Sequence, residues 1–247
     1  MAQWLTGRVV ENKRWTEQLH SLRVEAEIAP FSAGQFIKLG LDIGGEIVSR
    51  PYSLVNPPQE KILDVYFIEV PEGLFTMRLA ALRPEDEVLV GPRAAGFLVL
   101  AEVPQARHLW LISTGTGAGP FLSMIRTAEV WQRFERVVLV HAVRKGEELS
   151  YQDEIQAVSA AHPQQFSYIP FVSREVHASA LSGRVPQAIQ DGRLEQRAGI
   201  RFDAADSQVM LCGNPQMVKD TMDTLLERGL KKNKRSEPGQ ISVENYW

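Results

Sequence analysis

The chain has 247 residues, a net charge of -3 and a single cysteine, Cys212. The length allows one large domain or two ordinary ones, and one cysteine excludes an internal disulfide and favours a reducing compartment. The charge argues against a general nucleic-acid binder. No apolar run approaches the roughly 18 residues of a membrane span, and the five histidines show no metal-ligand spacing. We therefore expect a cytoplasmic protein with no metal, nucleic-acid or membrane partner.

Residues 1–101 consist mainly of short runs rich in branched and aromatic residues, separated by turn sequences such as Gly44-Gly45. Strands at this spacing favour an antiparallel β-barrel or a sandwich. One helix is expected among them, over Thr76–Leu82, with Thr76 as its cap. The expected strands are Arg8–Val10, Leu22–Glu27, Phe36–Leu39, Ile47–Val55, Val65–Ile68 and Val88–Val90.

From residue 102 strands alternate with helices, which is typical of a doubly wound α/β domain around a parallel sheet. Pro120 and Pro215 suit a first helical turn, Asn214 can cap the last helix and Gly229 can end it. The five expected strands are His108–Ser113, Val137–Ala142, Phe166–Val172, Gln208–Cys212 and Ile241–Val243. The expected helices are Pro120–Trp131, Gln152–Ala161, Pro186–Asp191 and Pro215–Arg228.

The stretch Arg50-Pro51-Tyr52-Ser53 offers a cation, a residue without an N–H, an aromatic ring and a hydroxyl within one strand. Pro51 predicts an edge strand or a strand end, because proline cannot donate to a ladder. An arginine fork suits phosphate and a ring stacks on a ring, so this edge fits a ligand that carries both. An ordinary edge strand with a solvated Arg50 and a half-buried Tyr52 is the alternative.

Two further loops each join an apolar strand to a helix. Gly115-Thr116-Gly117-Ala118-Gly119-Pro120 would let the backbone approach a phosphate at a helix N-terminus. It departs from Gly-x-Gly-x-x-Gly at the last position, and no acidic residue follows where a free ribose would be bound. The second loop is Cys212-Gly213-Asn214-Pro215, and nothing near it in sequence would activate Cys212 as a nucleophile.

Taken in order, the 50–53 stretch, the 115–120 loop, the 212–215 loop and the final Tyr246-Trp247 resemble the ferredoxin–NADP reductase family. The resemblance is closest to its short bacterial flavodoxin/ferredoxin–NADP reductases, which also end in Tyr-Trp, and it runs from about Trp4 to Trp247. It implies an FAD-binding antiparallel β-barrel over residues 1–101. An NADP-binding α/β domain with a five-stranded parallel sheet would follow over 102–247, with its aromatic tail returning to the flavin.

The resemblance also implies which residues contact the cofactors. Tyr52 would cover one flavin face, Ser53 would lie near flavin N5, and Arg50 and Thr76 would hold the flavin pyrophosphate. The full FAD set is Arg50, Pro51, Tyr52, Ser53, Phe67, Ile68, Glu69, Leu74, Phe75, Thr76, Thr116, Tyr246 and Trp247. Tyr52, Ser53, Cys212 and Glu244 would be nearest the reaction. Glu69 and Glu244 could equally be solvated carboxylates, and Cys212 a small buried thiol.

Arg144, Arg174 and Arg184 follow strands or turns at the edge where open α/β sheets bind ligands. Each alone could be a solvated arginine, but three together favour NADP over NAD, because a 2′-phosphate needs cations. The NADP set implied by the resemblance is Val143, Arg144, Ser173, Arg174, Arg184, Asn214, Pro215, Gln216 and Asp220.

The activity that the resemblance implies is FAD-dependent ferredoxin/flavodoxin–NADP reduction by a monomer. Two alternatives remain open: an NAD(P)H-dependent flavin or quinone reductase, and a flavin-bearing electron-transfer subunit of a larger complex. The partner would be ferredoxin or flavodoxin, acidic and bound transiently. The basic run Lys231-Lys232-Asn233-Lys234-Arg235 is either its landing site or a solvated loop.

Overall fold

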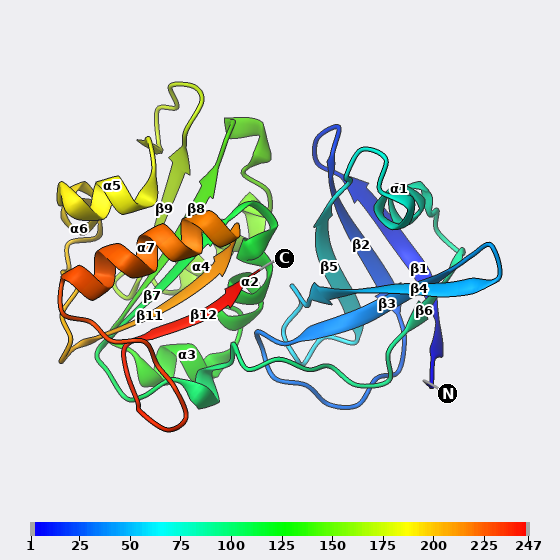
Figure 1. The fold of residues 1–247 in the computed structure, drawn as a ribbon, viewed down its shortest axis with the longest axis horizontal. Helices are drawn as coiled ribbons and strands as arrows, with labels where there is room; N and C mark the ends of the chain where they lie inside the picture. The colour runs from blue at the N-terminus through cyan, green and yellow to red at the C-terminus, as the bar shows by residue number, and fades with distance from the viewer. Residues whose placement is uncertain (1–2, 246–247) are drawn as a thin grey trace.

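The computed structural model describes residues 3–245, which form an all-β domain followed by an α/β domain beside it (Figure 1). A short 3₁₀ turn, η1 (Leu100–Glu102), lies where the sequence predicts the change of pattern, and we keep 1–101 and 102–247 as the proposed domain boundaries. Within the described part of the chain, no helix is long and apolar enough to cross a membrane.

The first domain is a six-stranded antiparallel sheet in the order β4-β3-β6-β1-β2-β5. An isolated bridge between Leu54 and Val65 joins the two outer strands, so the sheet closes into a barrel. Pro51 lies in β4, an outer strand of this order, as its missing N–H predicts. The strands are β1 (Leu5–Arg14), β2 (Leu19–Glu25), β3 (Phe36–Ile43), β4 (Glu46–Ser53), β5 (Ile62–Ile68) and β6 (Glu87–Val90).

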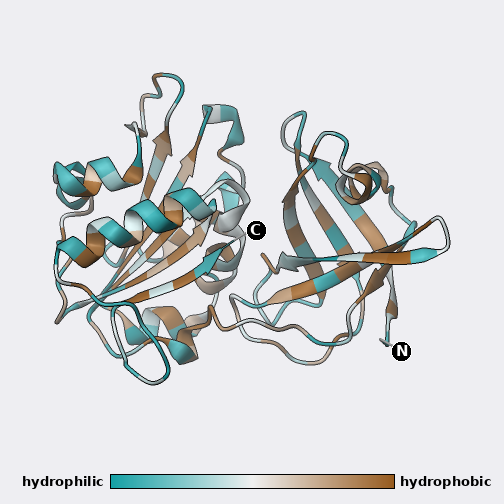
Figure 2. Ribbon diagram, viewed as in Figure 1, coloured by the Kyte–Doolittle hydropathy of each residue, from teal (hydrophilic) through white to brown (hydrophobic). Residues whose placement is uncertain are grey.

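Branched side chains on the inner face of these strands form the barrel core, with Val9, Leu22 and Leu39 fully buried. The hydropathy colouring shows the same apolar stripes along the strands (Figure 2). Helix α1 (Leu74–Ala81) covers this core with Phe75 and Leu79. The helix begins two residues earlier than expected and its N-cap is Gly73, so the prediction that Thr76 caps it is wrong.

The second domain is a parallel sheet in the order β10-β9-β8-β7-β11-β12. The five predicted strands are confirmed, and a two-residue strand that the sequence does not predict adds a sixth at one edge. The strands are β7 (His108–Thr114), β8 (Arg136–Val143), β9 (Phe166–Val172), β10 (Leu181–Ser182), β11 (Ser207–Gly213) and β12 (Ile241–Asn245).

Helices cover both faces of the parallel sheet, each over its own apolar core. α2 (Gly119–Met124), α3 (Ala128–Arg133) and α4 (Gln152–Ala161) pack on one face. α5 (Val185–Gln190), α6 (Arg193–Ala198) and α7 (Pro215–Glu227) pack on the other. The single helix expected over Pro120–Trp131 is wrong: it breaks after Met124, whose carbonyl accepts from the Thr127 hydroxyl, and α3 begins after Thr127, its N-cap residue.

The core over α2, α3 and α4 continues into the barrel, because it includes Leu19, Val55 and Tyr66. The two domains therefore share buried apolar surface, which restricts their relative motion. Ser123 of α2 strengthens this contact by donating from its hydroxyl to the Asn56 carbonyl at 2.8 Å.

Candidate functional site

The three sequence motifs meet where the barrel faces the carboxyl ends of β7 and β11. A methyl group added to Gly119, the first residue of α2, would lie 3.8 Å from the Cβ of Ser53. One added to Gly117 would lie 2.6 Å from the Cys212 carbonyl oxygen, so only glycine fits there. Ser53, the 115–120 loop and Cys212 are thus layered against one another, as the sequence predicts for a site between two domains.

Tyr52 is held in place by two aromatic neighbours. Its ring stacks on Phe75 of α1, with centroids 6.2 Å apart, and meets Phe67 of β5 edge-on at 5.9 Å. Burial raises the pKa of the phenol well above its usual range, and the nearby Arg50 opposes the rise. The hydroxyl therefore stays protonated at physiological pH, and the ring presents a fixed, uncharged flat surface.

Glu244 reaches the same place from the last strand. It lies opposite Cys212 in the register of β11 and β12, and Cys212 in turn lies opposite Ser113 of β7. A methyl group on Gly96 of the barrel would be 3.6 Å from Glu244 Oε2. Burial raises the pKa of this carboxyl to about 7. A proton can therefore be held on Glu244, or released, near neutral pH.

The surroundings of Tyr52 fit a dinucleotide with a flat apolar ring. Ile68 and Leu74 expose 36% and 72% of their surface although both are large hydrophobic residues. Arg50 is exposed, and its guanidinium donates only to the carbonyl of its neighbour Ser49 among residues 3–245. The first turn of α1 has neither a side-chain cap nor an acidic residue. Its N–H groups and Arg50 can therefore serve an anion.

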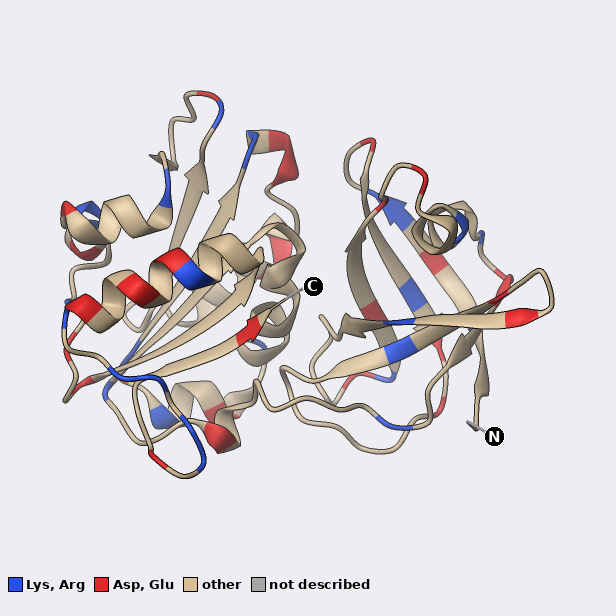
Figure 3. Ribbon diagram, in the orientation of Figure 1, with Lys and Arg blue, Asp and Glu red and all other residues tan. Residues whose placement is uncertain are grey.

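The three arginines expected at a 2′-phosphate follow three adjacent strands. Arg144 comes directly after β8, Arg174 is separated from β9 by Ser173, and the Arg174 N–H donates to the Arg144 carbonyl at 2.9 Å. Arg184 follows β10 and caps α5. All three are exposed, and across residues 3–245 none of the guanidinium groups takes part in a hydrogen bond or ion pair. Figure 3 shows basic segments at these strand ends.

The remaining residues expected at the nucleotide differ in their burial and in the hydrogen bonds that they already make within the protein. Asn214 caps α7 by accepting from the N–H groups of Gln216 and Met217, as predicted. Gln216 donates to Asp220 at 2.6 Å, which fits a role of Asp220 within the first turns of α7. Val143 is buried, and its carbonyl accepts from Ser173 through both the N–H and the hydroxyl.

Thr116 lies in a 3₁₀ turn, η2 (Gly115–Ala118), ahead of α2. His141 of β8 supports this turn from below, with its Nε2 3.2 Å from the Gly115 carbonyl. Burial lowers the pKa of His141 to about 4, so the ring is neutral and Nε2 can donate. The sequence motifs did not point to this residue, although a lone histidine in the apolar run Val137–Ala142 was a visible signal.

A buried polar joint between the domains was also missed. Tyr151, at the start of α4, donates from its hydroxyl to Asp64 Oδ1 at 3.0 Å and lies 2.5 Å from the Ser21 hydroxyl. Tyr66 donates to Ser150 at 3.0 Å beside it. Burial raises the pKa of Asp64 to about 6, while the bond from Tyr151 opposes the rise. Asp64 and Tyr151 are 87 positions apart in the chain, so no motif or spacing in the sequence could have predicted their contact.

Two groups of predicted residues are not part of the site that the structure describes. Tyr246 and Trp247 lie beyond the described residues, so their predicted stacking stays a prediction. The basic run 231–235 precedes β12, at the amino ends of the parallel strands, whereas Cys212 and Glu244 lie at the carboxyl ends. Within it, Arg235 pairs with Glu102 at 2.8 Å and lies over the exposed Phe97 ring.

Comparison with known proteins agrees with this geometry. Residues 111–223 match the family model described as "Oxidoreductase NAD-binding domain". The whole chain is 46% identical over 248 residues to the flavodoxin/ferredoxin–NADP reductase of Escherichia coli (strain K12), with 100% of both chains covered. The chain belongs to the flavodoxin/ferredoxin–NADP reductase family. The family resemblance seen in the sequence is therefore confirmed.

Two further relatives place the chain within this family. It is 35% identical to the ferredoxin–NADP reductase of Pseudomonas aeruginosa, covering 99% of this chain and 98% of that one. A crystal structure of a ferredoxin NADP+ reductase from Neisseria gonorrhoeae with bound FAD and NADP has the same fold. Its TM-score is 0.95 at 32% identity, with 100% of both chains covered, which confirms the predicted two-domain fold.

Proposed function

We propose that this protein is an FAD-dependent flavodoxin/ferredoxin–NADP reductase. The observation that carries the proposal is the meeting of Ser53, Cys212 and Glu244 between a barrel and a nucleotide-binding sheet, in a chain of this family. Bound FAD would accept a hydride from NADPH and pass electrons singly to the carrier. The chain's own contribution is to bind, orient and shield the two cofactors.

On the barrel side, Tyr52 offers its fixed ring to one face of the flavin, with Phe67 and Phe75 preventing its rotation. Arg50 and the first turn of α1 hold the pyrophosphate, with Leu74 and Thr76 on either side of Phe75. Ile68 and Pro51 complete the apolar surroundings. Ser53, buried at 6% exposure, contributes a hydroxyl beside the 115–120 loop, where Thr116 would meet the flavin.

On the sheet side, Arg144, Arg174 and Arg184 form a cationic edge that suits a 2′-phosphate better than a free ribose. Asn214, Pro215 and Gln216 bring the start of α7 toward the rest of the nucleotide. Cys212 lies at the point where the nicotinamide would approach the flavin, and its role is to shape that contact. Glu244, with its pKa raised to about 7, can hold a proton at its carboxylate oxygen or release it.

The carrier would be an acidic ferredoxin or flavodoxin that binds transiently to a cytoplasmic monomer. Opposite charges would steer the encounter. The 231–235 run offers three exposed lysines, Lys231, Lys232 and Lys234. However, it lies at the amino ends of the parallel strands, whereas Glu244 lies at their carboxyl ends. The exposed Arg50 and Arg78 lie on the barrel side instead. Two variants would show which basic group the carrier uses: one replaces the three lysines together by alanine, and the other replaces Arg78 by alanine. The KM for the carrier should rise only in the variant that removes its docking site.

The test begins with the purified protein. We expect it to be yellow, to release intact FAD on acid precipitation, and to be reduced by NADPH. Reduced protein should then pass electrons to flavodoxin or ferredoxin, with a rate that falls as salt rises. A protein that is colourless and takes up no added FAD would contradict the proposal. Faster turnover with free flavin or quinone than with either carrier would favour the flavin-reductase alternative.

A further inference from the structure

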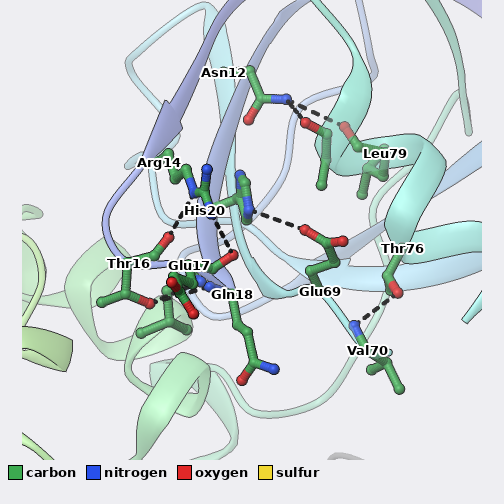
Figure 4. Close-up of polar contacts among 12 residues, drawn as sticks. Asn12, Arg14, Thr16, Glu17, Gln18, His20, Glu69, Val70, Thr76 and Leu79 are labelled. Atoms are coloured by element: carbon green, nitrogen blue, oxygen red, sulfur yellow. Dashed lines mark hydrogen bonds and ion pairs between the residues drawn. The ribbon is translucent and has the colours of Figure 1, made fainter. Parts of the chain in front are cut away.

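A surface pocket of about 500 Å³ lies on the barrel between β1, β2 and helix α1. Its wall includes Asn12, Arg14, His20, Glu69 and Arg83. Figure 4 shows how the polar groups here lie: the carboxylate of Glu69 points toward the ring of His20, and Thr76 points back toward Val70. None of the functional roles described above accounts for His20.

His20 and Glu69 form a pair across two neighbouring strands. The Nε2 of His20 lies 3.5 Å from Glu69 Oε2, and the two side chains expose 6% and 31% of their surface. Within residues 3–245 the buried Nε2 makes no hydrogen bond, and the acceptor that it faces is the Glu69 carboxylate at 3.5 Å. Burial lowers the pKa of His20, with Arg14 adding to this effect and Glu69 opposing it. The neutral ring can turn its Nε2–H toward this carboxylate in a polar contact that is longer than an ordinary hydrogen bond.

The pair is joined to the flavin-facing residues on two sides. The ring of His20 stacks on Phe67, with centroids 5.5 Å apart, and Phe67 in turn contacts Tyr52. On the other side, the Glu69 N–H donates to the Gln18 carbonyl at 2.7 Å. The next N–H, that of Val70, donates to Thr76 Oγ1 at 3.0 Å. Glu69 is therefore the residue that ties this segment to the neighbouring barrel chain, while Val70 is bonded to residues of the turn and of α1.

That turn carries the groups expected to hold the flavin pyrophosphate. Gly73 donates to the Val70 carbonyl at 2.9 Å and then begins α1, and no side chain caps the helix. Without a cap, the direction of the first helical N–H groups depends on how residues 69–73 are held. A displacement of the Glu69 side chain would release one end of this segment while leaving the barrel strands paired.

We propose that His20 and Glu69 are a positioning pair that fixes the 69–76 segment for the flavin pyrophosphate, and that neither side chain touches the flavin. This assigns Glu69 a positioning role instead of the flavin contact that the family resemblance implies. The inference rests on the proposed function, because it concerns how tightly FAD is held. It makes no demand on the nucleotide side, so binding of NADPH should not depend on the pair.

The test compares three variants of the whole chain: Glu69→Ala, Glu69→Gln and, as a matched control, Glu46→Ala, which removes an exposed carboxylate from the β3–β4 hairpin. FAD affinity is measured by quenching of flavin fluorescence on titration of the apoprotein. We expect Glu69→Ala to weaken FAD binding roughly three- to tenfold, as for the loss of one net polar interaction. Glu69→Gln should stay within about twofold, since its amide oxygen can still face the Nε2–H of His20.

Three further measurements separate positioning from mere stability. The midpoint of thermal unfolding of the apoprotein should be alike in Glu69→Ala and Glu46→Ala. At saturating FAD, the KM for NADPH and kcat should match the wild type. His20→Phe keeps the ring against Phe67 but removes the donor, so adding Glu69→Ala to it should weaken FAD binding no further.

An FAD affinity of Glu69→Ala within about twofold of wild type would overturn the inference, as would a Gln variant as weak as the Ala variant. In both cases the wild type still binds FAD, and the proposed function stands. A wild type that takes up no FAD would overturn the proposed function and this inference with it.

Discussion

The two surfaces that we propose bind the cofactors are built differently. On the barrel, Tyr52 is wedged between Phe67 and Phe75 and Ser53 is buried before any ligand arrives. On the sheet edge, Arg144, Arg174 and Arg184 are exposed and their guanidinium groups contact no partner among residues 3–245. A pre-packed surface loses little side-chain freedom on binding, whereas mobile arginines lose more. The barrel is thus suited to keep its ligand, and the sheet edge to exchange it.

The largest expected effect breaks the packed surface. Tyr52→Ala should lose FAD during purification and lower the free energy of unfolding of the flavin-loaded protein by about 3–5 kcal/mol, because packing and bound ligand are lost together. Chemical denaturation and the flavin-to-protein ratio measure the two losses. Tyr52→Phe, which keeps the ring, is the control, and a yellow Tyr52→Ala protein of normal stability would contradict the barrel's role.

The second effect concerns the joint between the two surfaces. Asp64 has a pKa of about 6 in the folded protein against 3.8 for an ordinary carboxyl, so the folded state binds more protons between these values. Its contribution therefore destabilises the fold increasingly as pH rises from about 4 to 6, and by up to about 3 kcal/mol above that.

Asp64→Asn removes this charge and keeps an acceptor for Tyr151. Its unfolding free energy should exceed that of the wild type at pH 7.5, with the difference shrinking toward pH 4. Urea denaturation across this range measures it, with Asp42→Asn, an exposed carboxyl on the β3–β4 hairpin, as the control. A difference between wild type and Asp64→Asn that does not vary with pH would contradict the assignment.

The third effect tests the proposed NADPH-binding surface at the carboxyl ends of the parallel strands. Arg174→Ala should raise the KM for NADPH roughly ten- to hundredfold, the usual loss of one charge-assisted phosphate contact, and leave that for NADH nearly unchanged. Arg93→Ala, an exposed arginine on the barrel side, should change neither. Steady-state kinetics with both nucleotides decides, and equal losses with NADPH and NADH would mean that Arg174 does not meet the 2′-phosphate.

The smallest effect concerns the chain end. We predict that Trp247 stacks on the flavin adenine, so removing Tyr246-Trp247 should weaken FAD retention by about 0.5–1.5 kcal/mol and spare hydride transfer. Flavin dissociation and the NADP+-induced difference spectrum, measured on the same truncated protein, separate this from stacking on the isoalloxazine. In that second case nucleotide binding would tighten and the spectrum would change. No change in either quantity would show that the tail contacts no cofactor.

Much of this arrangement could be predicted from sequence, because its signals are local. Pro51 marked an outer strand and Asn214 a helix cap, and the strand pattern placed Arg144 and Arg174 at the carboxyl ends of β8 and β9. Strands and helices with clear periodicity were placed to within a few residues. The two-residue β10 was too short to show a period, and α6 was not predicted, although α5, of the same length, was expected from Pro186.

What the sequence could not supply were contacts made only by folding. The Asp64–Tyr151 bond and the His20–Glu69 pair join residues far apart in the chain, and polar residues inside strands look like solvated ones until the partner is known. Another such contact bridges the break between α2 and α3, where the Trp131 indole donates to the Ile125 carbonyl at 3.1 Å. Local propensity alone favoured one continuous helix.

The central claim is that the barrel retains FAD while the parallel sheet exchanges NADP+. The most direct test loads the protein with both and passes it through a desalting column. We expect the eluted protein to carry close to one FAD per chain and almost no NADP+. The absorbance of the protein and nucleotide analysis of its acid extract measure these two contents. Loss of FAD as readily as NADP+, or retention of both, would contradict it.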